Sequence, residues 1–116
     1  MQSWLKSAGK PKGATAVAAV SRHSGSSTVY TVPANKVFTL THICVSLVET
    51  LAEEGRVVVS VAGSPLIEAT CDGIGGSSDV GLQGISYDVA AAGTITWAKT
   101  NTPNFSISIF GYLTNG

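Results

Sequence analysis

The stretch TVYTVPANKVFTLTHICVSLV, residues 28–48, predicts two β-strands joined by a turn. Its first residues, TVYTV, alternate and are rich in β-branched and aromatic side chains, which favour strands. Pro33 and Asn35 interrupt this pattern, as both residue types commonly do in turns. Residues 37–48 are again dense in β-branched and aromatic side chains. Neither alternating face is plainly polar: one is expected to carry Phe38, Leu40, His42 and Cys44, and the other Val37, Thr39, Thr41, Ile43 and Val45. We therefore expect the second strand to be covered on both faces, once by its own core and once by a neighbouring molecule.

Six further segments have the composition of short strands and are separated by turns that contain Gly, Pro or Asn. They comprise residues 16–21, 56–62, 66–71, 85–89, 94–99 and 105–113. The last of them alternates most clearly, with apolar residues at odd positions and Ser106 and Ser108 between them. Residues 72–79, DGIGGSSD, are expected to form a flexible loop, and no periodic helical segment of about ten residues is present. The sequence therefore predicts an all-β protein, an antiparallel β-sandwich or jelly roll of about eight short strands with an extended N-terminal arm.

The composition is that of one folded domain with few charges. The chain has 116 residues, of which 44% are apolar and 12% are charged, and its mean hydropathy is +0.29. A disordered chain would show lower hydrophobicity and a higher net charge. No apolar run approaches the roughly 18 residues that a membrane span needs. So few charges also argue against a highly soluble free monomer, which indicates association with other molecules.

The formal net charge of zero conceals an uneven distribution. Residues 1–22 contain four basic residues and no acid, whereas residues 23–116 contain three basic and seven acidic residues, a net charge of −4. We therefore divide the chain into a basic N-terminal arm, residues 1–22, and a β-sandwich domain, residues 23–116. The arm is expected to reach an acidic surface, such as that of a neighbouring copy; nucleic acid ranks second, because a tail that binds it is normally richer in Lys and Arg. Residues 14–20 are too short and too weakly apolar to predict a secretion signal.

Residue types that carry catalysis are scarce. His23 and His42 are too few for a metal centre, which on a jelly roll needs several His and a carboxylate that converge on one cavity. The serines lack a Gly-x-Ser-x-Gly elbow, and residues 72–76 lack the Lys-Ser/Thr ending of a phosphate-binding loop. We therefore expect no enzyme, no metal and no cofactor, and a hydrogen-bonded core or interface position for His42. Cys44 and Cys71 are expected to be reduced thiols of a protein made in a reducing cytosol.

The N-terminal arm also carries an apolar pair. Trp4 and Leu5 lie beside three lysines in an otherwise polar segment. Aromatic anchors dominate binding at protein interfaces, so this pair is expected to dock into another subunit. For the arm, the predicted partner-binding residues are Trp4, Leu5, Lys6, Lys10 and Lys12. For the contact between β-sandwich domains, they are Val37, Ile43 and Val45.

Two parts of the chain together resemble a known class of protein. The first is VYTVPANKVFTLT, residues 29–41, and the second combines AGTIT, residues 92–96, with FSISIFGYL, residues 105–113. They are similar to the opening and closing strands of small structural proteins of tailed bacteriophages. The resemblance implies a β-sandwich or jelly-roll module, commonly trimeric, that decorates a capsid or builds a tail or fibre, and it carries no catalytic residues. The acidic segment ETLAEEG, residues 49–55, and the basic arm lie outside the pattern.

The resemblance and the charge pattern lead to one principal expectation. The protein is expected to be a capsid decoration protein that forms a homo-oligomer, with a trimer expected, and clamps neighbouring capsid subunits through its arm. It would be made in the host cytoplasm and reside in the virion. Its expected partners are itself and the major capsid protein or another virion protein, with no small-molecule substrate, membrane or nucleic acid. The alternative is a tail or head fibre, or a receptor- or glycan-binding module that uses residues 72–79 and 99–104.

Overall fold

The computed structural model describes residues 13–48, 55–71, 77–101 and 104–116, and within these ranges it contains eight β-strands and no helix. The strands are β1 (Thr15–Arg22), β2 (Thr28–Thr31), β3 (Lys36–Val48), β4 (Gly55–Val61), β5 (Ser64–Cys71), β6 (Ser77–Val89), β7 (Thr94–Thr100) and β8 (Asn104–Asn115). The prediction of an all-β chain of about eight strands is confirmed.

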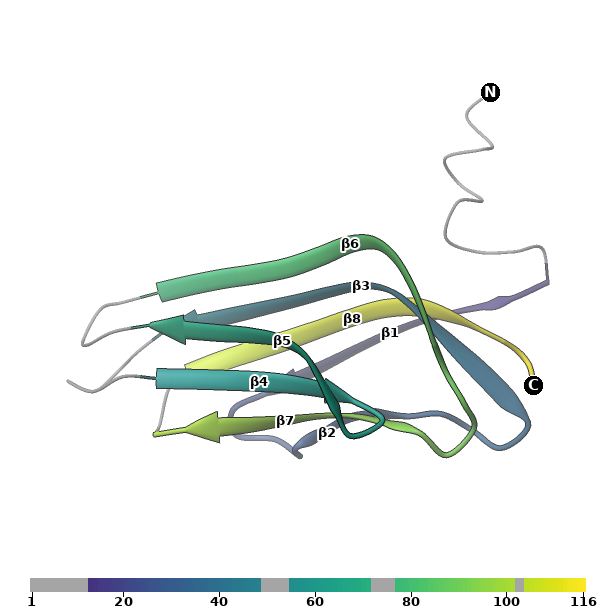
Figure 1. Ribbon diagram of the computed structural model, residues 1–116, viewed down its shortest axis with the longest axis horizontal. Helices are drawn as coiled ribbons and strands as arrows, with labels where there is room; N and C mark the ends of the chain where they lie inside the picture. The colour runs from purple at the N-terminus through teal and green to yellow at the C-terminus, as the bar shows by residue number, and fades with distance from the viewer. Residues whose placement is uncertain (1–12, 49–54, 72–76, 102–103) are drawn as a thin grey trace, which may run out of the picture.

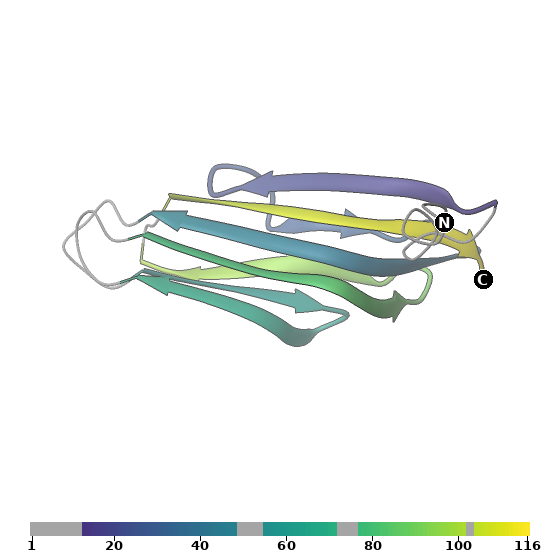
Figure 2. The same ribbon diagram turned by 90° about the horizontal axis from the view of Figure 1, so that it is seen from above.

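The strands form two four-stranded antiparallel sheets that pack as a sandwich (Figure 1; turned by 90° in Figure 2). One sheet has the order β1-β8-β3-β6 and the other the order β2-β7-β4-β5. The first strand pairs with the eighth, the second with the seventh, the third with the sixth and the fourth with the fifth. The chain is thus folded in half, and the resulting double strand is wrapped into the sandwich, which is the jelly-roll arrangement.

The core lies between the two sheets and is built from alternating residues of their inner faces. In β8, Phe105, Ile107 and Ile109 are buried, while the intervening Ser106 and Ser108 point outward, as the alternation predicts. The largest side chains with almost no exposed surface come from both sheets: Phe38, Leu40, Ile43, Leu47, Ile95, Ile107 and Ile109. Fully burying one such side chain contributes about 1.5–3 kcal/mol, so this layer dominates the stability of the fold.

A β-bulge in β3 exchanges the two faces of the strand. The pairing register shifts between Leu40 and His42, both toward β8 and toward β6. Before the shift Phe38 and Leu40 are buried in the core, and after it Ile43 and Val45 are buried there. One extra residue in a strand moves every following side chain to the opposite face. The expected faces, which continued from Phe38 and Leu40 to His42, are therefore wrong beyond the bulge.

Close contacts hold the backbone around the bulge. The Thr41 hydroxyl donates a hydrogen bond to the Phe110 carbonyl oxygen at 3.1 Å. Gly111 has no room for a side chain, because an added Cβ would clash with the Thr39 carbonyl oxygen and lie 2.7 Å from the Phe38 ring. Glycine at this position lets β8 and β3 approach closely beside the bulge.

Strand β6 is longer than the sequence indicates. The predicted strand covered residues 85–89, whereas β6 runs over Ser77–Val89 and pairs with β3. Its first half is rich in Ser and Gly, which give little strand signal, and Gly84 has a positive φ of 68°. Residues 77–79 of the predicted loop therefore belong to β6. The other residues of that loop, 72–76, lie outside the described ranges.

The first strand belongs to the sandwich. β1 pairs with β8 over its whole length, from Thr15 opposite Leu113 to Arg22 opposite Ser106. The predicted division after residue 22 would therefore remove a strand from the sheet, and the sandwich begins at Thr15. The charge pattern misplaced this boundary because Arg22, grouped with the basic arm, is the last residue of a strand. Of the expected arm, residues 1–12 lie outside the described ranges.

Candidate functional site

The outer surface of the β1-β8-β3-β6 sheet, which we call the long-strand face, is arranged in four cross-strand rows. Antiparallel pairing places residues of the four strands side by side, and alternate residues of each strand point outward. From β1 to β6, the rows are Ala16, Tyr112, Thr39 and Asp88; Ala18, Phe110, His42 and Gln83; Val20, Ser108, Cys44 and Gly81; and Arg22, Ser106, Ser46 and Asp79. Of these four rows, only the first and the last contain Asp or Arg.

The two middle rows contain no Asp, Glu, Lys or Arg and expose two large apolar side chains. Val20 of β1 keeps 61% of its surface exposed, and Phe110 of β8 keeps 46%. Ser108 faces Val20 and Ala18 faces Phe110 across the β1–β8 pair, so the two apolar side chains are diagonal neighbours. Apolar side chains gathered in an uncharged part of a surface are typical of sites where proteins associate.

A small polar network holds Phe110 and His42 in place. The Thr41 hydroxyl, which donates its proton to the Phe110 carbonyl oxygen, lies 2.9 Å from Nδ1 of His42. Because that proton is already used, Nδ1 must act as the donor, and in the neutral imidazole Nε2 is left as an acceptor. The two rings meet edge-on, with 6.3 Å between their centroids. His42 is exposed on this face, which rules out the expected core position and leaves the interface position as a prediction.

The last row carries opposite charges at its two ends. Arg22 lies on the edge strand β1 and Asp79 on the edge strand β6, with Ser106 and Ser46 between them. Neighbouring strands are about 4.8 Å apart, so Arg22 and Asp79 are separated by roughly 14 Å and do not pair within one chain. Both residues are exposed, and both charges are therefore accessible to a second molecule.

The outer surface of the β2-β7-β4-β5 sheet, the short-strand face, is polar by comparison. Arg56 of β4 and Glu68 of β5 form a salt bridge of 2.7 Å, and their side chains are 48% and 45% exposed. Thr70 and Thr100 face Arg56 from the two neighbouring strands. An exposed pair of this kind is well solvated and contributes less than about 1 kcal/mol. This part of the short-strand face therefore exposes paired charges to water, unlike the middle rows of the long-strand face.

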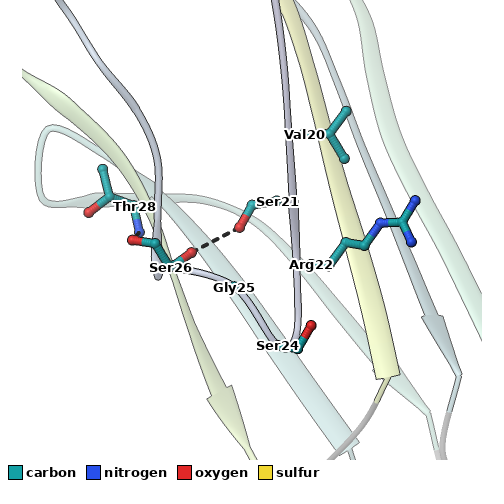
Figure 3. A pocket seen from close by; sticks show the side chains of 7 residues that line it. All are labelled: Val20, Ser21, Arg22, Ser24, Gly25, Ser26 and Thr28. Carbon is teal, nitrogen blue, oxygen red and sulfur yellow. Dashed lines mark hydrogen bonds between the residues drawn. The ribbon is translucent and has the colours of Figure 1, made fainter.

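An open pocket adjoins the long-strand face at the turn between β1 and β2 (Figure 3). It is lined by Val20, Ser21, Arg22, Ser24, Gly25, Ser26 and Thr28. The Ser21 hydroxyl donates to the Ser26 carbonyl oxygen at 2.9 Å, and the Trp97 indole N–H lies 3.0 Å from each of these two oxygens. Figure 3 shows Ser21 turned toward Ser26, whereas Val20 and Arg22 point to the other side of β1. These hydrogen bonds fasten the turn to β7 and leave Val20 and Arg22 on the long-strand face.

The residues predicted for the contact between β-sandwich domains do not share a surface. Ile43 and Val45 are 1% and 0% exposed, because after the bulge they point into the core of their own chain. Side chains that fill this core cannot reach a second subunit, so the prediction is corrected at both positions. Val37 is half-buried near the start of β3, where it faces Thr114 of β8.

The predicted residues of the arm lie outside the described part of the chain. They are Trp4, Leu5, Lys6, Lys10 and Lys12. Among the residues that the structure describes, no three His, Cys, Asp or Glu side chains are grouped so that they could hold a metal ion, and no helix has the length and apolarity to cross a membrane. Cys44 is exposed on the long-strand face, Cys71 is buried, and no disulfide joins the two.

The segments expected to bind sugars in the alternative function adjoin one end of the sandwich. The strand ends beside them are close together, since Val48 pairs with both Ser77 and Asn104. Much of these segments, residues 72–76 and 102–103, lies outside the described ranges. Trp97, which shares the phase of the buried Ile95 in β7, is partly buried against the core and meets Phe105 edge-on with 4.7 Å between the ring centroids. Its ring therefore contributes to the packing of the core.

No protein-family model and no curated protein matches the chain. The resemblance to bacteriophage structural proteins therefore remains an expectation. The arrangement of the long-strand face and the jelly-roll strand order are the observations from which a function is inferred.

Sequence patterns did not single out the residues that distinguish the long-strand face. The alternation of β8 carried a signal for Phe110, because this residue occupies the same phase as Ser106 and Ser108 and must point outward with them. The relation between Arg22 and Asp79 depends on the registers of three strand pairs, which no local pattern specifies.

Proposed function

We propose that the protein is a structural component of a virion, specifically a capsid decoration protein that associates with itself and with neighbouring capsid subunits. The observation that carries the proposal is the long-strand face, where Val20 and Phe110 are exposed in two rows without charged residues. Contact with another protein stabilises such a surface, because the contact removes apolar area from water. The jelly-roll order and the resemblance to bacteriophage structural proteins support the same assignment.

The proposed mechanism is stabilisation by preferential binding, and it involves no chemical reaction. A protein that binds the assembled shell but not its separated subunits stabilises the shell by about 2.7 kcal/mol per site when its free concentration is about 100 times the dissociation constant. Repeated over many sites, this contribution makes the shell more resistant to heat and to internal pressure.

The residues before β1 extend the reach of each chain. Residues 1–14 contain three of the seven basic residues and could span at most about 50 Å if fully extended. That length is sufficient for Trp4 and Leu5 to dock on a neighbouring subunit. The lysines around this anchor would favour an acidic surface on that subunit.

Deletion of residues 1–12 tests the arm without touching the sandwich, since β1 begins at Thr15. The shortened chain is expected to keep its thermal transition and its oligomeric state, but to lose binding to empty shells of the same virion in a co-sedimentation assay. The triple variant K6E/K10E/K12E should bind weakly for the same reason.

The control for these variants is Lys99→Glu, which changes an exposed lysine of β7 in the sandwich. It should bind shells like the parent chain. If the shortened chain saturates shells with unchanged affinity, the role of the arm is wrong. If the full chain binds no shell at all, the proposed function itself is wrong.

A further inference from the structure

We propose that the long-strand face binds a second copy of this chain, face to face, about a twofold axis that runs parallel to the strands between β8 and β3. The proposal deepens the proposed function, because it assigns self-association to one surface. It rests on that function for the biological meaning of the contact, whereas its geometry comes from the pairing registers of the sheet.

A twofold axis in this position lays each row of the face over the same row of the partner in reverse order. β1 then lies over β6 of the second copy, and β8 lies over β3. In the last row, Arg22 meets the partner's Asp79, and Asp79 meets the partner's Arg22. The two contacts are equivalent by symmetry, so each charge that is too far from its counterpart within one chain is paired in the dimer.

The same arrangement opposes the apolar residues of the middle rows to defined partner residues. Val20 lies over the partner's Gly81, which has no side chain, and Phe110 lies over the partner's His42. Val20 and Phe110 are the two most exposed of the large apolar side chains that the structure describes. Facing sheets stand about 10 Å apart and share the space between them. Val20 over Gly81 is a large residue over a small one, which fills that space without a clash or a cavity, whereas Phe110 and His42 bring two rings together.

The charged residues at the ends of the first and last rows favour this axis over a twofold axis perpendicular to the strands. An axis perpendicular to the strands would lay β6 over β6 and bring Asp79 over the partner's Asp88. Like charges directly opposite one another are destabilising. Arg22 would then face the partner's Ala16 and gain no opposite charge. Aligned sheets cross at about 30°, which displaces the ends of each row relative to the partner's row. With the axis parallel to the strands, the long Arg22 side chain can span this displacement and reach the partner's Asp79.

The size of the face predicts weak pairing. Four strands about 4.8 Å apart and four rows about 6.7 Å apart cover roughly 500 Å². A standard stable interface buries roughly 800 Å² on each partner. We therefore expect a dimer that dissociates on dilution in the micromolar range. Weak contacts of this kind become effective where the subunits are held close together, as they would be on a shell.

Sedimentation velocity of the full chain over about a hundredfold range of concentration tests the pairing, and the parent is expected to pass from monomer to dimer. Ala18 and Ala98 offer a matched pair of variants, because both are exposed alanines of strands, one on each outer face. Ala18→Asp should raise the dissociation constant more than about 100-fold, because it buries a carboxylate in the contact. Ala98→Asp should leave the dissociation constant unchanged.

A charge exchange tests the orientation of the two copies. Arg22→Asp and Asp79→Arg each place like charges at both ends of the last row and should raise the dissociation constant about tenfold. The double variant R22D/D79R restores opposite charges across the contact and should bring the constant back to within about threefold of the parent value. Both residues are exposed, so each variant is expected to keep the thermal transition of the parent.

A parent chain that stays monomeric over the whole range, or an Ala18→Asp variant that dimerises like the parent, overturns the inference. So does a trimer, because a cyclic trimer joins two different surfaces of each chain, whereas a twofold contact uses one surface twice. In these cases shell binding by the full chain would still support the proposed function. A dimer that obeys the charge exchange but binds no shell would support the inference and contradict the proposed function.

Discussion

The two outer faces of the sandwich cover the same core but carry different chemistry. On the short-strand face, Arg56 of β4 and Glu68 of the edge strand β5 form an exposed salt bridge. On the long-strand face the middle rows carry Val20 and Phe110, and the charges lie in the outer rows. Folding depends chiefly on the inner faces, so the outer faces are free to differ. The difference is the basis on which we propose the long-strand face, and not the short-strand face, as the surface that meets another protein.

The largest effect is expected where the bulge sets the two faces of β3. Gly111→Ala puts a methyl group against the Thr39 carbonyl oxygen and the Phe38 ring, and the backbone beside the bulge must move to relieve these contacts. We expect a loss of about 3 kcal/mol or more in the free energy of unfolding, measured by urea denaturation. In Gly25→Ala, the control, the added Cβ meets the Arg22 carbonyl oxygen at an ordinary 3.4 Å. Equal losses in the two variants would contradict this account of the bulge.

A smaller effect separates the two sides of β8. Ile109→Ala leaves a cavity in the core and should lower the free energy of unfolding by about 2–5 kcal/mol. Phe110→Ala removes an exposed ring from the long-strand face and should cost less than about 1 kcal/mol in the monomer, while it weakens self-association. Urea denaturation and sedimentation give the two quantities. A loss at Phe110 as large as that at Ile109 would show that Phe110 belongs to the core.

The smallest effect concerns the charges of the two faces. A double-mutant cycle with Arg56→Ala and Glu68→Ala should give a coupling free energy below about 1 kcal/mol. High salt should reduce it further, because charges are screened within about 3 Å at about 1 M ionic strength. The same cycle on Arg22 and Asp79 should give no coupling in the dilute monomer and a measurable one in the dimer. Coupling at Arg22 and Asp79 in the monomer would remove the contrast between the faces.

The strand content of the chain could be predicted because most strands carry their own signal. In β8 the alternation of apolar residues with Ser106 and Ser108 gives both the strand and its buried side. In β3 the strand was predicted, but its faces were not, because Thr41 adds one residue that local patterning does not reveal. The predicted loop included residues 77–79 of β6, and residues 80–84 were assigned to no strand, because the Ser and Gly residues of this part give little strand signal.

The candidate surface was harder to predict than the fold, because it combines residues from four strands. The prediction of Ile43 and Val45 as contact residues failed at the bulge, which turns both side chains into the core. Phe110 could have been placed outward from its phase in β8. The relation of Arg22 to Asp79 needs the full strand order, which is a property of the whole chain. Local patterns thus specify elements, whereas the binding surface depends on tertiary register.

The pairing of the first strand with the last has a consequence for the timing of assembly. Ala18 and Val20 reach their places beside Phe110 and Ser108 when β1 joins β8, at the far end of the chain. On the ribosome, β1 is made before β8 and has no partner in its sheet until β8 follows. A nascent polypeptide therefore lacks the completed long-strand face until β8 has been made.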